Sequence, residues 1–258
     1  MSNQPTILIC NDDGITAGGI ANLIAVAKDY GRVVVVAPDS PQSAQGHSIT
    51  IEDPIRLRKV DLFGPEVEAY ECSGTPVDCI KIAKYVVLKD TPVQLCLSGI
   101  NHGSNASTNV LYSGTMSAAM EASLEGIPSI GFSLLDFAAD ADFSAAQQVV
   151  RQLVERTLEQ GLGKANLLNV NIPKLPFEEI KGIRICRQAE GHWAEDFQEG
   201  VDPMGRKYYW LKGKYVYLDE GEESDVWALE NGYVSVVPVM HDLTQYDALP
   251  GLAHLTGL

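Results

Sequence analysis

The amino-acid sequence predicts an α/β fold in which a doubly wound, mostly parallel sheet of Rossmann-like type is followed by a C-terminal β-rich extension. Short apolar runs such as Thr6–Cys10 and Val33–Val36 are typical of strands buried on both faces of a parallel sheet. Between such runs, apolar residues recur at helical spacing, and this alternation favours right-handed crossovers around one sheet. Ligands of doubly wound sheets bind at the carboxyl ends of the strands, so we expect the functional residues there.

The elements of the first part of the chain follow from this pattern. The predicted strands are Thr6–Cys10, Val33–Val36, Val93–Leu97, Ile130–Leu134 and Leu167–Ile172. The predicted helices are Gly19–Tyr30, Pro76–Val87, Gly114–Leu124 and Phe143–Gln160. The third helix ends clearly, because Gly126 and Pro128 form a C-terminal stop signal. We therefore expect an α/β catalytic core over residues 1–180.

Residues 181–258 are predicted to form the β-rich extension. The strand-like runs are Gly182–Arg187, Lys207–Leu211, Lys214–Leu218 and Tyr233–Val237, with a tight turn at Lys212–Lys214. Large aromatic rings cluster around that turn (Tyr208, Tyr209, Trp210, Tyr215 and Tyr217). A two-stranded hairpin is marginal alone and needs a surface to pack against, and clustered exposed aromatic residues mark interfaces. The hairpin either folds back on its own sheet or takes part in oligomerisation.

Composition and charge limit the classes of function. The 258-residue chain has a formal net charge of −15, which argues against nucleic acid as a partner because binding a phosphate backbone relies on Lys and Arg. No apolar run approaches the roughly 20 residues that cross a bilayer, and Met1–Pro5 lacks the basic region of a signal peptide. The five cysteines form no CxxC pair, so we expect reduced thiols and a cytoplasmic location. An acidic protein that binds a small anion needs a local positive source, either a cation or a helix N-terminus.

Two adjacent carboxylates follow the first predicted strand. Asp12 and Asp13 lie in the segment Asn11–Gly14, and neighbouring carboxylates at a buried strand end are costly unless a positive group lies beside them. The simpler interpretation is a turn in which Asp13 caps the next helix.

Polar loops after later strands add neutral oxygen atoms. The loop Asp39–Ser48 contains Ser43, and the loop Leu97–Asn105 contains Asn101 and Asn105. Each loop alone is typical of an ordinary surface connection, but all of them follow strands of the same predicted sheet. Two carboxylates, a hydroxyl and a carboxamide suit Mg²⁺ or Mn²⁺ rather than zinc. The five histidines are scattered along the sequence and suggest no competing catalytic arrangement.

A turn rich in hydroxyl groups opens the helix that begins near Gly114. Ser113 or Thr115 could be a plain N-cap, the more frequent use of such residues. The exposed N–H groups and the dipole of a helix N-terminus also suit a phosphate group. Ser113, Gly114 and Thr115 are therefore candidate phosphate ligands.

Together these motifs resemble those of the SurE family, the stationary-phase survival nucleotidases. The similar segments are Ile9–Ile15, Ala37–Asp39 with Ser43, Ser73–Cys79, Ser98–Gly103 and Tyr112–Thr115, in the order of the family. Asn169–Pro173, Gly182–Arg184 and Gly232–Ser235 are similar but less distinctive. One departure is Gln42, which offers no charge where many relatives carry an Arg or Asn shortly before the serine.

The resemblance implies a divalent-metal-dependent phosphatase that hydrolyses nucleoside 5'- and 3'-monophosphates. It implies that Asp12, Asp13, Ser43 and Asn101 match the metal ligands, with one Mg²⁺ or Mn²⁺ ion per subunit. It also implies a cytoplasmic homodimer or homotetramer whose C-terminal portion exchanges elements between subunits.

Two catalytic routes are open at this stage. The cation could polarise a phosphoryl oxygen and activate a water, or Asp12 or Asp13 could attack and form an aspartyl-phosphate. In either case the amide of Asn105 and the helix start at Ser113–Thr115 would hold the remaining phosphoryl oxygens. Two other functions compete: a broader phosphatase acting on sugar phosphates or polyphosphate, and a non-catalytic nucleotide-sensing module. The paired carboxylates argue against the sensing module, and no residue is identified that recognises a base or ribose.

Overall fold

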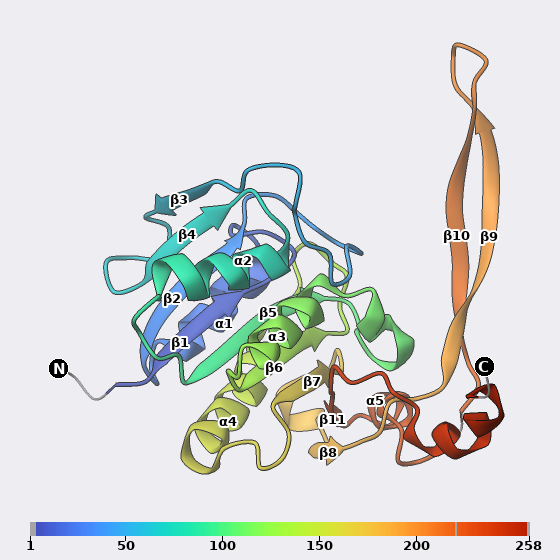
Figure 1. The fold of residues 1–258 in the computed structure, drawn as a ribbon. Helices are drawn as coiled ribbons and strands as arrows, with labels where there is room; N and C mark the ends of the chain where they lie inside the picture. The colour runs from blue at the N-terminus through green and yellow to red at the C-terminus, as the bar shows by residue number, and fades with distance from the viewer. Residues whose placement is uncertain (1–3, 220, 257–258) are drawn as a thin grey trace.

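The computed structural model describes residues 4–219 and 221–256, and its main feature is a nine-stranded sheet (Figure 1). The order across the sheet is β3-β4-β2-β1-β5-β6-β7-β11-β8. The strands are β1 (Thr6–Cys10), β2 (Arg32–Pro38), β3 (Leu57–Val60), β4 (Glu68–Cys72), β5 (Leu95–His102), β6 (Ser129–Leu134), β7 (Leu167–Ile172), β8 (Ile183–Ile185) and β11 (Val234–Pro238). The β3–β4 and β7–β11 pairs are antiparallel, and the other neighbours are parallel. The predicted doubly wound, mostly parallel sheet is confirmed.

Helices cover both faces of this sheet (Figure 1). On one face α1 (Gly18–Ala27) packs beside α4 (Ser144–Gln160), and on the other α2 (Pro76–Ile82) packs beside α3 (Gly114–Leu124). Successive side chains of β1 point to opposite faces, so Ile7 and Ile9 join the first core and Leu8 the second. The predicted helix after Pro76 is confirmed, and a π-helical turn over Ala83–Val87 extends it.

Local sequence explains where two of these helices begin. Thr75 and Asp78 form a reciprocal capping box at α2: the Thr75 hydroxyl accepts the Asp78 N–H, and the Asp78 carboxylate accepts the Thr75 N–H. Ser113 caps α3, since its Oγ accepts a backbone N–H of the first turn at 3.0 Å. The start of α3 matters most for function, because it lies at the edge of the sheet where the candidate site residues gather.

A long antiparallel hairpin projects from the body of the protein (Figure 1). Its strands β9 (Gly191–Val201) and β10 (Lys207–Tyr217) pair along their whole length. The prediction of a turn at Lys212–Lys214 is wrong, because Gly213 lies inside β10 opposite Glu195. The chain reverses instead between Val201 and Lys207, where the Asp202 carboxylate accepts backbone N–H groups of the turn.

Strands from both sides of the predicted boundary at residue 180 share the main sheet. β8 and β11 lie beyond residue 180 and extend the sheet past β7, so residues 181–258 contribute to the core as well as to the hairpin. Strands β3, β4 and β9 and helix α5 (Asp225–Glu230) are not predicted from the sequence. β3 is charged and partly exposed, and α5 has only six residues, so neither has a clear apolar period.

Two further expectations concern the environment of the chain. No helix within residues 4–219 and 221–256 combines the length and the apolar character needed to span a membrane. All five cysteines are buried and free, as the sequence predicts.

Candidate functional site

The candidate site lies where the strand order of the sheet reverses. β1 has β2 on one side and β5 on the other, and the crossovers that follow these strands open a crevice at their carboxyl ends. The segment Asn11–Gly14 leaves the end of β1, and Asn101 is the residue before the last in β5. A cavity of about 780 Å³ opens here, and Asp12, Asp13, Ser43 and Asn101 all line it.

Asp12 is held in the cavity wall by the start of α3. The residue is 4 % exposed, and the Thr115 hydroxyl donates a hydrogen bond to its Oδ1. Gly114 makes room for this contact, because a Cβ there would lie 2.6 Å from the Asp12 Cβ. Burial raises the pKa of the Asp12 carboxyl to about 6; the Thr115 hydrogen bond opposes this shift, and the nearby Asp13 adds to it. A positive charge in the cavity would stabilise the ionised form.

Asp13 shares the cavity with His102. Burial raises the pKa of the Asp13 carboxyl, and the charge and backbone N–H of His102 lower it in part. Within the described part of the chain, Asp13 Oδ2 is buried without a hydrogen-bond partner. The His102 ring packs edge-on against Phe143 with centroids 5.1 Å apart. A buried carboxylate oxygen without a partner is costly, so a ligand at this point would complete the site.

Ser43 reaches the cavity because its loop is fastened to the site on both sides. The backbone N–H of Gln42 donates to the carbonyl oxygen of Asp12 at 2.7 Å. The backbone N–H of Gly46 donates to the carbonyl oxygen of Tyr112 at 3.2 Å. The Ser43 loop therefore bridges the end of β1 and the start of α3.

The amide of Asn101 is oriented by its own loop. Its Nδ2 donates to the carbonyl oxygens of His102 at 3.2 Å and Gly103 at 2.9 Å. Its Oδ1 lies 3.5 Å from Thr115 Oγ1, the hydroxyl that also contacts Asp12. One hydroxyl thus brings a carboxylate from the end of β1 and an amide oxygen from the end of β5 close together.

These residues fit a small divalent cation. They offer carboxylate, hydroxyl and amide oxygens, the ligand atoms that Mg²⁺ and Mn²⁺ prefer. The buried Asp12 carboxyl and the orphaned Asp13 Oδ2 are the groups that such an ion would stabilise. Residues 4–219 and 221–256 contain no cluster of three or more His, Cys, Asp or Glu side chains suited to a metal. An ion here would therefore be bound by the carboxylates of Asp12 and Asp13 and by neutral oxygens of Ser43 and Asn101. This set of metal ligands stays a prediction.

The predicted phosphate ligands differ in their position relative to the cavity. Ser113 and Asn105 line the cavity. Asn105 is 6 % exposed, and its Nδ2 donates to Ser133 Oγ at 2.8 Å. Gly114 and Thr115 pack directly against Asp12, and Thr115 has no exposed surface. The phosphate-binding roles of all four residues stay predictions, with the Thr115 hydroxyl already engaged by a carboxylate.

The hairpin supplies another part of the cavity wall. The lining residues that it contributes are Trp193, Glu195, Leu211, Lys212, Gly213, Tyr215 and Tyr217. The Tyr215 hydroxyl lies 2.8 Å from Ser107 Oγ, so β10 is bonded to the 3₁₀ turn Ser107–Leu111 that follows the Asn105 loop. The aromatic residues at the base of the hairpin therefore face the same cavity as the carboxylates.

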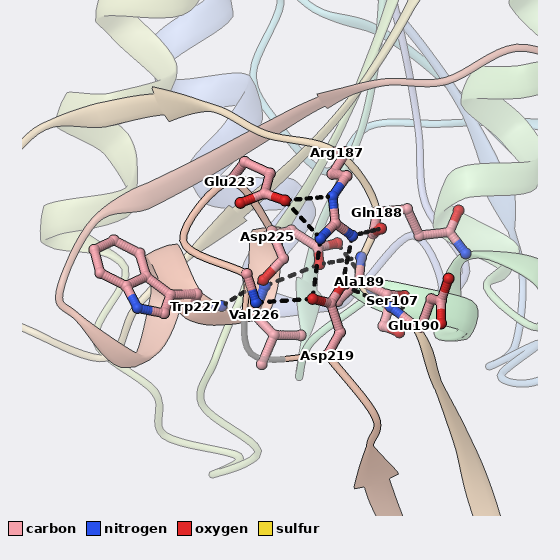
Figure 2. A network of polar contacts seen from close by, with 12 residues as sticks. Ser107, Arg187, Gln188, Ala189, Glu190, Asp219, Glu223, Asp225, Val226 and Trp227 are labelled. Carbon is pink, nitrogen blue, oxygen red and sulfur yellow. Dashed lines mark hydrogen bonds and ion pairs between the residues drawn. The ribbon is translucent and has the colours of Figure 1, made fainter.

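A polar network anchors the base of the hairpin (Figure 2). Arg187, before β9, forms an ion pair with Asp219, after β10, so the network ties both strands together where they leave the body. Asp225 has no exposed surface, and its carboxylate accepts the N–H groups of Ser107 at 2.8 Å and Ala189 at 2.9 Å. Figure 2 shows these groups converging from three separate segments of the chain. The hairpin base is therefore fixed relative to the cavity.

Several of the cavity residues are not identified from the sequence. A signal exists for His102, since it directly follows Asn101 in the same loop. A signal also exists for Phe137, which follows the predicted strand Ile130–Leu134. No comparable signal exists for Trp193, because only tertiary packing brings it to the end of β5.

The fold and the candidate site together define a Rossmann-like α/β protein with a cavity that contains two carboxylates at the switch point of its sheet. Comparison with known families shows which family of this class the chain matches. The family model described as "Survival protein SurE" matches residues 7–195. The chain belongs to the SurE family.

Close relatives cover almost the whole chain. A protein of Flavobacterium psychrophilum named "5'-nucleotidase SurE" is 54 % identical over 250 residues, which are 97 % of each chain. A protein of the same name from Cytophaga hutchinsonii is 56 % identical over 247 residues, 96 % of this chain and 95 % of the relative. The crystal structure of the SurE protein from Aquifex aeolicus superimposes with a TM-score of 0.85 at 40 % identity, covering 98 % of this chain and all of that one.

Proposed function

We propose that this chain is a divalent-metal-dependent nucleotidase that hydrolyses nucleoside 5'- and 3'-monophosphates to a nucleoside and phosphate. The observation that carries the proposal is the buried pair Asp12 and Asp13, which shares a cavity with Ser43 and Asn101 at the switch point. The relatives named 5'-nucleotidase SurE support the substrate class.

Asp12, Asp13, Ser43 and Asn101 would hold Mg²⁺ or Mn²⁺, one ion per subunit. Bound there, the ion would offset the charge of the phosphoryl group and favour formation of the nucleophile. A protein of net charge −15 repels a phosphate ester, and the positive charge of the ion would offset this repulsion.

The side chains around the ion have separate roles in the proposed reaction. Asp12 is rigidly held by Thr115 and faces the start of α3, so it serves as a fixed ligand. Asp13 is only partly buried and has an oxygen without a partner, so it is the carboxylate able to reach the substrate. It could accept the proton of an attacking water or attack phosphorus itself. The N-terminus of α3, at Ser113 and Gly114, places the positive end of the helix dipole beside the phosphoryl group.

The test is phosphate release by the purified protein. Adenosine 5'- and 3'-monophosphate, ribose 5-phosphate and polyphosphate are assayed with Mg²⁺ or Mn²⁺ and again with EDTA. We expect nucleotide hydrolysis that requires the metal and is lost in Asp13→Asn. Preferential release from sugar phosphate or polyphosphate would favour the broader phosphatase, and nucleotide binding without release would favour the sensing module.

We also propose that the protein acts in the cytoplasm as a homodimer or homotetramer without nucleic-acid or membrane partners. The exposed hairpin supports the oligomer: Tyr209 is 58 % exposed and Trp210 is 67 % exposed. Aromatic surface of this kind is favourable when a second subunit covers it.

A further inference from the structure

The Ser43 loop (Asp39–Ser48) has little apolar anchorage. It begins an irregular connection over residues 39–56 that joins β2 to β3, and connections longer than about 12–15 residues are usually functional or disordered. Ser43 is exposed, and the large apolar residues that follow it, Ile49 and Ile51, are 48 % and 80 % exposed. Burial of apolar surface therefore contributes little to the position of Ser43, which depends on polar contacts instead.

The backbone beside Ser43 is strained. Ala44 has a φ of 60°, in the left-handed region that residues with a Cβ rarely adopt. Such a conformation persists only where the surrounding structure fixes the chain. Contacts outside the segment Ser43–Ala44 must therefore define the conformation of the loop.

His47 makes a side-chain contact of this kind with a buried carboxylate. Its Nε2 lies 2.9 Å from Glu121 Oε2, and Lys81 Nζ of α2 donates to the other carboxylate oxygen. Glu121 lies in α3 and is 4 % exposed, and a buried charge is costly unless it is paired. The hydrogen bond with His47 lowers the pKa of the Glu121 carboxyl, burial opposes this shift, and Lys81 adds to it. His47 and Lys81 therefore stabilise the charge of Glu121 together.

The helix that carries Glu121 also holds Asp12. The first turn of α3 contains Thr115, whose hydroxyl donates to the Asp12 carboxylate. Further along the same helix, Glu121 holds the Ser43 loop through His47. A movement of the loop on α3 would therefore move Ser43 relative to Asp12.

The end of the loop is fastened to α2. Asp78 is 2 % exposed, and its carboxylate accepts the Thr50 hydroxyl at 2.6 Å and the Thr50 N–H at 3.1 Å. The Thr75 hydroxyl donates to the carbonyl oxygen of Ser48 at 2.7 Å. These contacts hold residues 48–50, so the His47 side chain is the attachment of this segment that lies nearest to Ser43 in sequence.

We propose that His47 and Glu121 are positioning residues, whose contact fixes the Ser43 loop on α3 and holds Ser43 in the cavity before any ligand binds. The effect on an ion rests on the proposed function, in which Ser43 is a metal ligand, whereas the position of the loop needs no metal. A group that is already ordered loses little conformational entropy when it binds. Loss of the contact between His47 and Glu121 therefore loosens the loop and weakens ion binding.

Hydrogen exchange in EDTA tests the position of the loop without a metal. In His47→Leu, peptides that cover residues 39–50 should exchange about 2- to 13-fold faster than in wild type, the range that corresponds to loss of one net hydrogen bond. His47→Gln keeps an N–H donor and should restore most of the protection. His241→Leu, the same change at another exposed histidine, is the matched control and should leave exchange of the loop unchanged.

Lys81→Met separates positioning of the loop from packing between α2 and α3. It removes the other partner of Glu121 and leaves the contact with His47 in place, so the loop should exchange at close to the wild-type rate. Unchanged exchange in His47→Leu would overturn the proposal. Equal acceleration in His47→Leu and Lys81→Met would also overturn it, because Glu121 would then only support the packing of the helices.

Mn²⁺ binding, measured by calorimetry, tests the consequence for the site. We expect His47→Leu to weaken binding about 2- to 13-fold, and Ser43→Ala to weaken it as well. Weaker binding in Ser43→Ala with unchanged binding in His47→Leu would overturn the proposal. If wild type binds no Mn²⁺, or if neither variant alters its affinity, the predicted ligand set fails. Hydrogen exchange alone then decides whether His47 positions the loop.

Discussion

Replacing Asp12 by Asn should stabilise the metal-free protein, and the gain should depend on pH. The Asp12 carboxyl has a pKa of about 6 in the folded protein against an ordinary value of 3.8, chiefly because it is buried. Because the pKa of the Asp12 carboxyl is higher in the folded protein than in the unfolded chain, ionisation of this group destabilises the folded state. The carboxamide of Asn cannot ionise, and its oxygen can still accept the hydrogen bond from Thr115.

The size of the effect follows from linkage between protonation and folding. Below the ordinary pKa, Asp12 is protonated in both states, so its burial carries no ionisation cost. As the pH rises from about 4 to about 6, the unfolded chain ionises first and the folded protein progressively loses stability. Above the folded pKa the deficit levels off at about 3 kcal/mol. The variant should therefore be more stable than wild type by about 1.5 kcal/mol at pH 5 and by about 3 kcal/mol at pH 8.

Urea unfolding in EDTA, followed by tryptophan fluorescence between pH 5 and pH 8, measures this difference. Asp140→Asn, a change of the same kind at an exposed position, sets the background for loss of one negative charge. Added Mn²⁺ should reverse the order, because only wild type gains stability from binding an ion. A gain that does not change with pH would refute the reasoning, since the stability of Asp12→Asn would then have no connection to the buried carboxylate.

Three other predictions concern the metal, the start of α3 and the hairpin. Chelation with EDTA should abolish nucleotide hydrolysis, and Mg²⁺ or Mn²⁺ should restore it; full activity after exhaustive metal removal would contradict the site. Gly114→Val should cut activity sharply without unfolding the sheet, because its Cβ would lie 2.6 Å from the Asp12 Cβ, whereas Gly251→Ala meets nothing within 4 Å and should be silent; wild-type kinetics in Gly114→Val would show that this turn is only a helix cap. Replacing residues 198–210 by a short glycine turn should lower the mass measured by light scattering; an unchanged mass would show that the arm does not hold the subunits together.

The sheet could be predicted from the sequence because its information is local. A strand buried on both faces must be apolar at every position, as Val33–Val36 are, and a helix that packs on one face shows a helical period. The strands of a doubly wound sheet also end at one edge. The pattern therefore predicts that the loops with Asp12, Ser43 and Asn101 meet, and the structure places all three residues in one cavity.

The hairpin turn shows how local signals mislead. The Lys-Gly-Lys triplet at Lys212–Lys214 is typical of a tight turn, yet Gly213 continues β10 because β9 pairs with it residue by residue. The true turn contains Asp202, Pro203 and Gly205, residue types with specific turn geometry. Strand pairing therefore overrides the turn preference of the single residue Gly213, and the chain reverses where several turn-forming residues coincide with the end of the paired register.

The sequence by itself determined the layers of the fold, the starts of α2 and α3, and the candidate site residues that follow the strands of the sheet. The tertiary structure alone decided what surrounds those residues: the burial that raises the pKa of Asp12, the position of His102 beside Asp13, and the aromatic wall at Trp193. The physical reason is distance along the chain. Side chains become neighbours through contacts such as the bond between Asp225 and Ser107, and no periodicity of the sequence encodes a contact between segments so far apart.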